Sequence, residues 1–191
     1  MCRVIHVFGD DVSTDTIYPG RFMATMLPNE TPQYAFADIP ELNGQLNHPV
    51  VKGGKSSSIE YEDVIIVAGD NFGCGSSREQ AVSTLVGNNV IVVAKSFARI
   101  FKQNAINLGL RIYTCPDIKA DVGHMLKVRA TPNGITVDNS TTGMEFKIES
   151  LPASAQEVLN AGGLIPYTRN RLQMKPKGLL KRFWKKIKEQ L

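Results

Sequence analysis

Residues 69–81 read Gly-Asp-Asn-Phe-Gly-Cys-Gly-Ser-Ser-Arg-Glu-Gln-Ala, a glycine-rich stretch between two apolar segments. Residues 64–68 before it are short and β-branched, as in a buried strand, and the apolar residues after it recur at helical spacing. We therefore expect a strand, a loop and a helix in that order, the pattern of an α/β fold. The glycines allow sharp turns and close approach, and the free N–H groups of the helix's first turn can bind a carboxylate or phosphate.

A simpler interpretation of this loop is a helix cap. Ser76 is followed three residues later by Glu79, which fits a capping box with the helix beginning near Ser76. Two further features favour recognition of a carboxylate, because a cap requires neither the second hydroxyl of Ser77 nor the forked guanidinium of Arg78. The loop lacks the lysine of a phosphate-binding P-loop, the Gly-x-Gly-x-x-Gly pattern and the second glycine of a nucleophile elbow.

Three motifs in a fixed order resemble one protein family. Residues 69–81 resemble the active-site loop of the swivel domain in the aconitase and isopropylmalate isomerase superfamily, in the form of its separate small subunit. Residues 9–22 resemble a second signature of that family, and residues 96–110 contain a third. The resemblance implies a single three-layer β/β/α swivel domain over residues 1–170, followed by a basic amphipathic tail at residues 171–191.

The resemblance also implies roles for particular side chains. Ser76 corresponds to the catalytic base, an alkoxide that removes the proton beside a substrate carboxylate. Ser77 and Arg78, together with Gly75, correspond to the residues that hold that carboxylate. Asp15 matches an active-site aspartate, although by itself it is better explained as a helix cap or turn former.

Two departures from the family pattern bear on substrate choice. Relatives that use tricarboxylates carry an arginine where this chain has Ala24, and the neighbouring Met23 indicates an apolar wall suited to a branched alkyl group. Isopropylmalate or a similar alkylmalate therefore fits better than citrate or homocitrate. Gln80 replaces a histidine of many relatives and cannot exchange a proton as histidine does. Arg21 is expected to tie its loop to the sheet, with a substrate contact as the alternative.

The family also implies a metal cofactor outside this chain. A [4Fe–4S] cluster would polarise the leaving hydroxyl, and we expect it in a larger partner subunit within a heterodimer or heterotetramer. The cysteines and histidines here are scattered singly, without the spacing of ligands, so we expect this chain to bind no metal. They are Cys2, Cys74, Cys115, His6, His48 and His124.

Periodicity and turn residues predict the remaining elements. Strands are expected near residues 2–8, 63–68, 89–94, 110–113, 126–131 and 135–138. Helices are expected near residues 31–37, 76–87, 97–108, 152–161 and 178–190. Asn133-Gly134 is a typical two-residue turn, which predicts that the last two strands form a hairpin.

Composition and charge narrow the class of protein. With 191 residues and 42% hydrophobic content, the chain can enclose one core, and no signal peptide or membrane span is apparent, so we expect a cytoplasmic protein. Residues 175–191 carry a net charge of +6, which leaves −2 on the rest. Leu180, Trp184, Ile187 and Leu191 would line one face of a helix there. Docking on protein is the favoured role of this tail, ahead of a membrane surface; nucleic acid is not expected.

Two classes of function follow. The first is the small subunit of an isopropylmalate-type hydro-lyase in leucine biosynthesis, with 2,3-dimethylmalate or another alkylmalate as the nearest alternative substrate and homoaconitase activity as a more distant one. The second is a non-catalytic module that binds small anions at the same helix terminus. Iron in a co-purified complex would distinguish the two classes.

Overall fold

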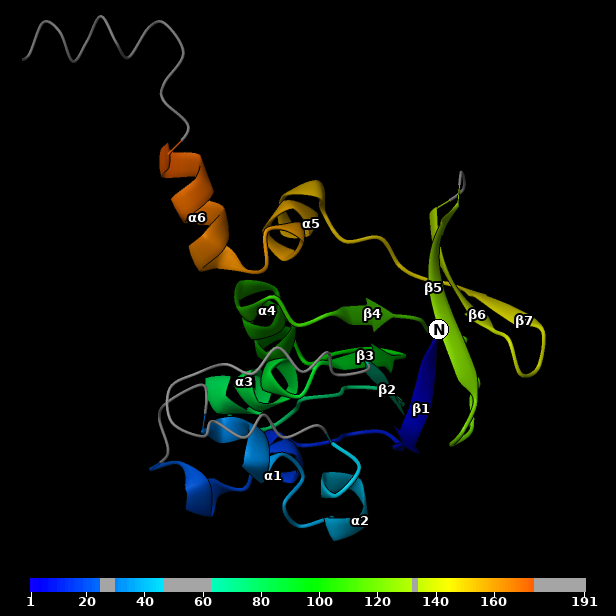
Figure 1. Cartoon of the computed structure of the whole chain (residues 1–191), viewed down its shortest axis with the longest axis horizontal. Coiled ribbons are helices and arrows are strands. Elements are labelled where there is room, and N and C mark those ends of the chain that lie inside the picture. The colour runs from blue at the N-terminus through cyan, green and yellow to red at the C-terminus, as the bar shows by residue number, and fades with distance from the viewer. Residues whose placement is uncertain (25–29, 47–62, 132–133, 174–191) are drawn as a thin grey trace, which may run out of the picture.

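A computed structural model describes residues 1–24, 30–46, 63–131 and 134–173 (Figure 1). Seven strands in these ranges form one sheet in the order β4-β3-β2-β1-β5-β6-β7. Their bounds are β1 Cys2–Val7, β2 Val64–Ala68, β3 Val90–Ala94, β4 Ile112–Thr114, β5 Met125–Thr131, β6 Gly134–Asn139 and β7 Met144–Lys147. Strands β1 to β4 pair in parallel and β5 to β7 pair antiparallel. The expected mixed α/β class is confirmed.

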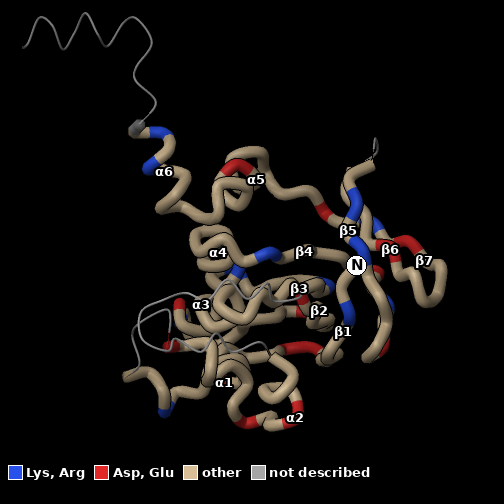
Figure 2. The backbone as a smooth tube through the Cα atoms, in the orientation of Figure 1, with Lys and Arg blue, Asp and Glu red and all other residues tan. Residues whose placement is uncertain are grey.

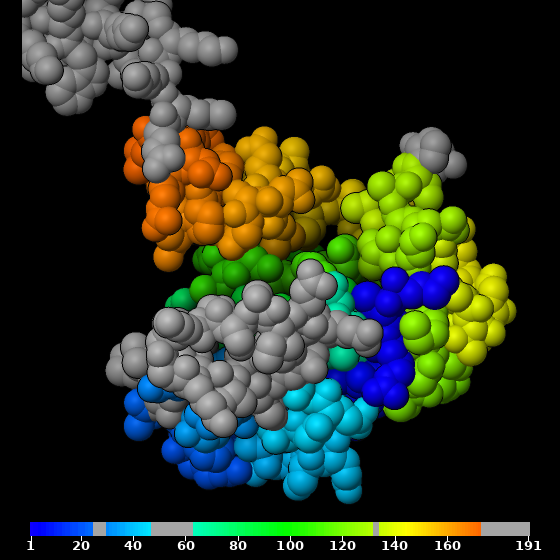
Figure 3. All heavy atoms as spheres, viewed as in Figure 1, coloured from blue at the N-terminus to red at the C-terminus, as the bar shows by residue number. Residues whose placement is uncertain are grey.

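The helices connect the parallel strands or follow the antiparallel ones. They are α1 Thr14–Ile17, α2 Pro40–Asn43, α3 Glu79–Gly87, α4 Arg99–Leu108, α5 Ala153–Asn160 and α6 Leu164–Gln173, with 3₁₀ turns at Gly20–Phe22 and Thr31–Tyr34. Helices α5 and α6 pack on α4 (Figure 3). Helix α6 contains two arginines and no acidic residue (Figure 2). Within the described ranges, every helix lacks the length and apolar character that a membrane span requires.

The parallel strands are buried on both faces. In β2, Val64 and Ile66 belong to the apolar cluster beneath α3 and α4, whereas Ile65 and Val67 belong to a second cluster on the opposite face. That second cluster includes Leu126, Val137 and Phe146 of the antiparallel strands. Strands β5 to β7 therefore cover the face that the helices leave open, and the expected three-layer β/β/α arrangement is confirmed.

Sequence patterns located most of the elements. All six expected strands are present, and β5 and β6 pair as a hairpin that ends at Thr131 opposite Gly134, with residues 132–133 outside the described ranges. The helix expected at 31–37 is a 3₁₀ turn, and β7, α1, α2 and α6 were not predicted. The helix expected at 178–190 lies outside the described residues. Helix α6 continues to Gln173, across the boundary expected at 170/171, and the separate tail stays a prediction.

Candidate active site

Two loops that are far apart in sequence lie side by side at the ends of β1 and β2. The first loop follows β1 and leads into α1, and the second loop follows β2 and leads into α3. The Asp11 amide donates to the carbonyl of Asp70 at 2.8 Å, and the Gly73 amide donates to that of Val12 at 2.7 Å. The Thr14 amide donates to the carbonyl of Cys74 at 2.8 Å. Because β1 and β2 are parallel neighbours, both loops leave the sheet at its carboxyl edge, where α/β proteins commonly bind ligands. The family motif at residues 9–22 and the one at residues 69–81 therefore form one surface.

Two glycines are required by the geometry of the second loop. Gly73 has a φ of +81°, and a Cβ atom there would lie 2.1 Å from the ring of Phe101 in α4. Gly75 has a φ of +90°, and its Cβ would lie 3.5 Å from the Thr14 hydroxyl. Both positions thus need the left-handed backbone that glycine adopts without cost, and Gly73 also needs the missing side chain. The loop is held against α4 and α1 in this way.

The expected capping box is absent, and this interpretation of the loop was wrong. Helix α3 begins at Glu79, with Arg78 as an extended N-cap residue that makes no side-chain cap hydrogen bond. Ser76 therefore precedes the helix instead of starting it. Its side chain is exposed, and its Oγ lies 3.2 Å from Oγ1 of Thr14, which also donates to the Ser76 carbonyl at 3.1 Å. Long-range bonds between the two loops thus replace the local bonds of a cap.

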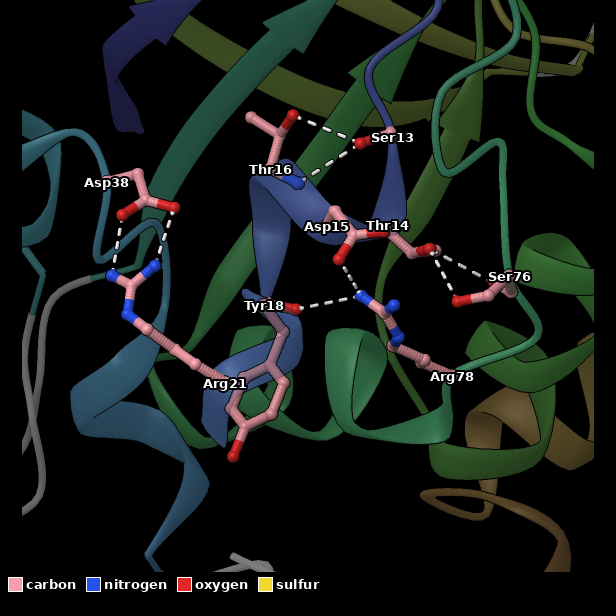
Figure 4. A network of polar contacts seen from close by, with 9 residues as sticks. All are labelled: Ser13, Thr14, Asp15, Thr16, Tyr18, Arg21, Asp38, Ser76 and Arg78. Atoms are coloured by element: carbon pink, nitrogen blue, oxygen red, sulfur yellow. Dashed lines mark hydrogen bonds and ion pairs between the residues drawn. The ribbon is translucent and has the colours of Figure 1, made fainter. Parts of the chain in front are cut away.

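Arg78 and Asp15, which come from different motifs, form an ion pair (Figure 4). The Arg78 Nη1 donates to Oδ1 of Asp15 and lies 3.4 Å from the carbonyl of Tyr18. The Arg78 side chain is 16% exposed and that of Asp15 is 58% exposed, so the guanidinium is recessed and the carboxylate faces solvent. Ser77 is exposed beside them, and its carbonyl accepts a 3.4 Å hydrogen bond from Asn104 of α4.

Other candidate residues have no described contact with this cluster. Arg21 forms a two-pronged ion pair with Asp38, at 3.0 and 2.5 Å, so the expectation that it ties its loop to the sheet was wrong. Met23 and Ala24 are exposed and directly precede residues 25–29, which are not described. Gln80 is partly buried in the first turn of α3. The roles of Met23, Ala24 and Gln80 stay predictions.

Thr14 is a site residue that sequence reasoning missed. It is 1% exposed and follows Ser13, whose Oγ caps α1 by accepting from the Thr16 amide at 3.1 Å. Only the meeting of the two loops brings its hydroxyl to Ser76, 62 positions away. The sequence indicated Thr14 only by its place in the family motif at residues 9–22, where it directly precedes Asp15.

The described cysteines do not fit an iron–sulfur cluster. Cys2 lies in β1, Cys74 in the second loop, and Cys115 after β4, where burial raises the pKa of its thiol to about 11 and so opposes the thiolate form that binds metal. The Cys74 Sγ contacts the Asp11 carbonyl at 3.3 Å. Among the described residues, no group of three His, Cys, Asp or Glu side chains is placed to hold a metal ion. His48 lies outside the described ranges.

Known proteins are similar to this chain in sequence and fold. The family described as Aconitase C-terminal domain matches residues 7–113, which include both loops. The 3-isopropylmalate dehydratase small subunit of Methanosarcina mazei is 41% identical over 165 residues, covering 85% of this chain and 92% of that protein. This chain belongs to the 3-isopropylmalate dehydratase small-subunit family. The resemblance inferred from the three motifs is thereby confirmed.

Other members of the dehydratase small-subunit family agree in sequence and in structure. The small subunit of Aquifex aeolicus is 37% identical over 169 residues, covering 88% of this chain and 94% of that protein. The crystal structure of a 3-isopropylmalate dehydratase from Methanocaldococcus jannaschii superposes with a TM-score of 0.70 at 35% identity. The superposition covers 88% of this chain and 93% of that one. The shared region thus spans nearly the whole length of these relatives.

The site is an open surface. A cavity of about 290 Å³ lies elsewhere, between β4 and α5, and is lined by residues that include Tyr113, Thr114 and Asn160. Ser76 and Ser77, by contrast, are exposed at the edge of the sheet. Among the described residues, these two side chains leave one side of the site open.

Proposed function

We propose that this chain is the small subunit of a 3-isopropylmalate dehydratase, which converts 2-isopropylmalate to 3-isopropylmalate in leucine biosynthesis in the cytoplasm. Family membership supports the reaction class. The observation that carries the proposal at the level of residues is the joining of two motifs, which places the Ser76 hydroxyl and the Arg78–Asp15 pair on one exposed surface. A carboxylate-bearing acid is the ligand such a surface suits best.

In the proposed reaction, Ser76 acts as the base. Its alkoxide takes the proton from the carbon beside a substrate carboxylate; the C–H bond breaks, an O–H bond forms, and the electron pair becomes a carbon–carbon double bond as hydroxide leaves. Adding water back with the opposite orientation gives the isomer. A serine hydroxyl is a weak base at neutral pH, so the alkoxide requires positive charge nearby. The N-terminal end of α3 and the guanidinium of Arg78 supply it.

Arg78 and Ser77 hold the substrate carboxylate in this proposal. Asp15 binds Nη1 of Arg78, which directs the rest of the guanidinium fork toward the acid. The ion pair supports Asp15 as an active-site residue that acts on Arg78. Gly75, with a φ of +90°, lets the loop turn immediately before Ser76 and Ser77.

A large partner subunit completes the site. Its surface would cover Ser76 and Ser77 and exclude water, which strengthens every electrostatic interaction within the site. The family implies that the partner carries a [4Fe–4S] cluster that polarises the leaving hydroxyl, since the described cysteines of this chain do not fit one. The proposed assembly is a heterodimer or a heterotetramer of small and large subunits.

Substrate choice depends on the segment after the Gly20–Phe22 turn. Met23 and Ala24 are exposed there, and neither can pair with a third carboxylate. An alkyl-substituted malate is therefore preferred over citrate or homocitrate. Turnover of 2-isopropylmalate, 2,3-dimethylmalate and homocitrate analogues by the assembled enzyme tests this preference, and greater activity on a tricarboxylate would contradict it.

Replacement of the base gives the central test. Ser76→Ala in the anaerobically assembled two-subunit enzyme should lower kcat by about 10²- to 10⁴-fold, because a proton acceptor is lost while the docking surface is retained. Ser140→Ala, which removes an exposed hydroxyl between β6 and β7, is the matched control and should retain full activity. Normal turnover by Ser76→Ala would show that the base lies elsewhere.

Iron analysis separates this enzyme from a non-catalytic anion-binding module. The complex should contain iron and show hydro-lyase activity that neither purified subunit possesses. Tight binding of small carboxylates by the isolated chain, with no activity after the large subunit is added, would favour the module instead.

A further inference from the structure

A buried hydroxyl lies directly behind the proposed base. Thr14 is 1% exposed, and its hydroxyl contacts both the backbone carbonyl and the side chain of Ser76. Its Oγ1 lies 3.1 Å from the carbonyl oxygen of Ser76 and 3.2 Å from the Ser76 Oγ (Figure 4). The Thr14 amide is also fixed, by a 2.8 Å hydrogen bond to the Cys74 carbonyl. This hydroxyl is therefore held in place by contacts within the chain itself.

The hydroxyls of Thr14 and Ser76 differ in the hydrogen bonds that each can donate and accept here. A threonine hydroxyl has one proton to donate and two lone pairs that accept, whereas a carbonyl oxygen only accepts. Thr14 donates its proton to the Ser76 carbonyl, which leaves the lone pairs of Oγ1 able to accept from the Ser76 hydroxyl at the 3.2 Å contact. In the resting chain the Ser76 hydroxyl can therefore donate to Thr14 while Thr14 donates to the carbonyl.

The arrangement changes when Ser76 loses its proton. The alkoxide can no longer donate, and a hydrogen bond to an ionised oxygen is about twice as strong as one between neutral groups. The Thr14 proton reaches either acceptor by rotation about its own Cβ–Oγ1 bond, because both oxygens already lie within 3.2 Å. One hydroxyl therefore serves both states without any displacement of heavy atoms.

We propose that Thr14 is a positioning residue that donates its hydroxyl proton to the Ser76 alkoxide and so stabilises the active form of the base. The inference rests on the proposed function, in which Ser76 removes the substrate proton. Thr14 is buried behind Ser76 and acts through it. The substrate proton moves only between carbon and the Ser76 oxygen, and Thr14 keeps its own proton throughout.

Thr14→Val tests the inference, because valine keeps the branched shape and removes the hydroxyl. In the assembled enzyme, kcat should fall about 10- to 100-fold, the loss expected for one charge-assisted hydrogen bond. The KM should change less than about threefold, since Ser77 and Arg78 stay in place. Thr14→Ser retains the hydroxyl and should restore most of kcat; if both variants lose activity equally, the inference is overturned.

The double variant separates this inference from the assignment of the base. If Thr14 acts through Ser76, then Thr14→Val should cause no further loss of activity in the Ser76→Ala enzyme. An inactive Ser76→Ala enzyme together with fully active Thr14→Val would overturn the role of Thr14 and leave the base intact. Normal activity in Ser76→Ala would overturn both. Should Thr14→Val fail to assemble, Thr14→Ser against Thr14→Ala in the same assay decides, with equal activities contradicting the inference.

Discussion

At the scale of single residues, the site is organised by one ion pair that crosses between motifs. Asp15 is more than half exposed, yet it orients an arginine that is largely recessed. A structurally similar pair, Arg21 with Asp38, lies on the surface with both side chains more than half exposed. Because the Asp15 carboxylate faces solvent, we expect this pair to contribute little to stability and to matter, in the proposed function, through the orientation of Arg78.

Asp15→Asn should therefore affect substrate binding. The amide cannot hold the guanidinium as firmly, and we expect KM of the assembled enzyme to rise about 3- to 10-fold, within the range of an exposed charged hydrogen bond. Asp38→Asn removes the comparable exposed pair and should leave KM unchanged. A loss of kcat beyond about 100-fold with unchanged KM would show that Asp15 itself exchanges a proton.

Motifs indicated the candidate site residues, but not how they meet. Ser76 and Arg78 were identified from the second loop, and Asp15 from the first. The capping box was wrong because the local Ser-x-x-Glu pattern contains no information about Thr14. Thr14 binds the Ser76 carbonyl, and the helix begins only after the extended residue Arg78. Contacts between loops 62 positions apart have no local signature.

At the scale of elements, Gly73 fixes how the second loop meets α4. Gly73→Ala places a methyl group 2.1 Å from the Phe101 ring in a left-handed backbone. Strain and overpacking together should lower the free energy of unfolding by about 2–5 kcal/mol. Urea denaturation followed by circular dichroism measures the change.

Gly123→Ala is the matched control for that experiment. Gly123 has a φ of +90°, but a methyl group added there would meet no atom within 4 Å beyond the adjoining residues. Only the backbone strain of about 1 kcal/mol therefore remains. Equal losses in the two variants would show that the contact with Phe101 contributes nothing.

Strong periodicity explains which elements could be predicted. Strands β2 and β3 are continuous apolar runs buried along their whole length. Strand β7 has four residues with only Phe146 buried, which leaves no pattern to detect. Helix α6 carries Pro166 in its first turn, where proline is tolerated although it normally indicates a break. Short or weakly amphipathic elements depend on packing that their own sequence does not encode.

At the scale of the whole molecule, the parallel half of the sheet is tied together by an ion pair. Arg111, before β4, donates to the carboxylate of Asp63, before β2, at 2.6 and 2.5 Å, and so spans β3. The hydrogen bond from Arg111 lowers the pKa of Asp63 from its usual value, and burial opposes this effect. The pair therefore stabilises the folded chain when Asp63 is ionised.

The pH dependence of stability should show this pair. Because the folded pKa of Asp63 is lowered, its contribution is complete above the unfolded value of about 4 and is lost as pH falls through the folded value. Both side chains are partly exposed, so we expect Arg111→Gln to cost less than about 1 kcal/mol at pH 7. The difference from wild type in urea unfolding should shrink toward about pH 3 and in about 1 M NaCl. A difference that persists in acid would contradict the assignment.

Strands β2 and β3 are apolar and buried along their whole length, so both faces of this part of the sheet are covered. What covers the second face could not be read from periodicity, because β5 to β7 are separated from β2 in sequence and share with it only a buried cluster. The three-layer arrangement came from family resemblance for this reason.

The contact between Ser13 and Cys74, which joins the two loops as an isolated bridge, sets an order of events during synthesis. The first loop leaves the ribosome early and has nothing to dock on until the second has followed and β2 has paired with β1. A nascent chain shorter than this lacks the contacts between the two loops, and a peptide copied from residues 69–81 alone would lack half of its support. The paired loops that the proposed partner would cover therefore form only after the chain has folded as far as β2 and the start of α3.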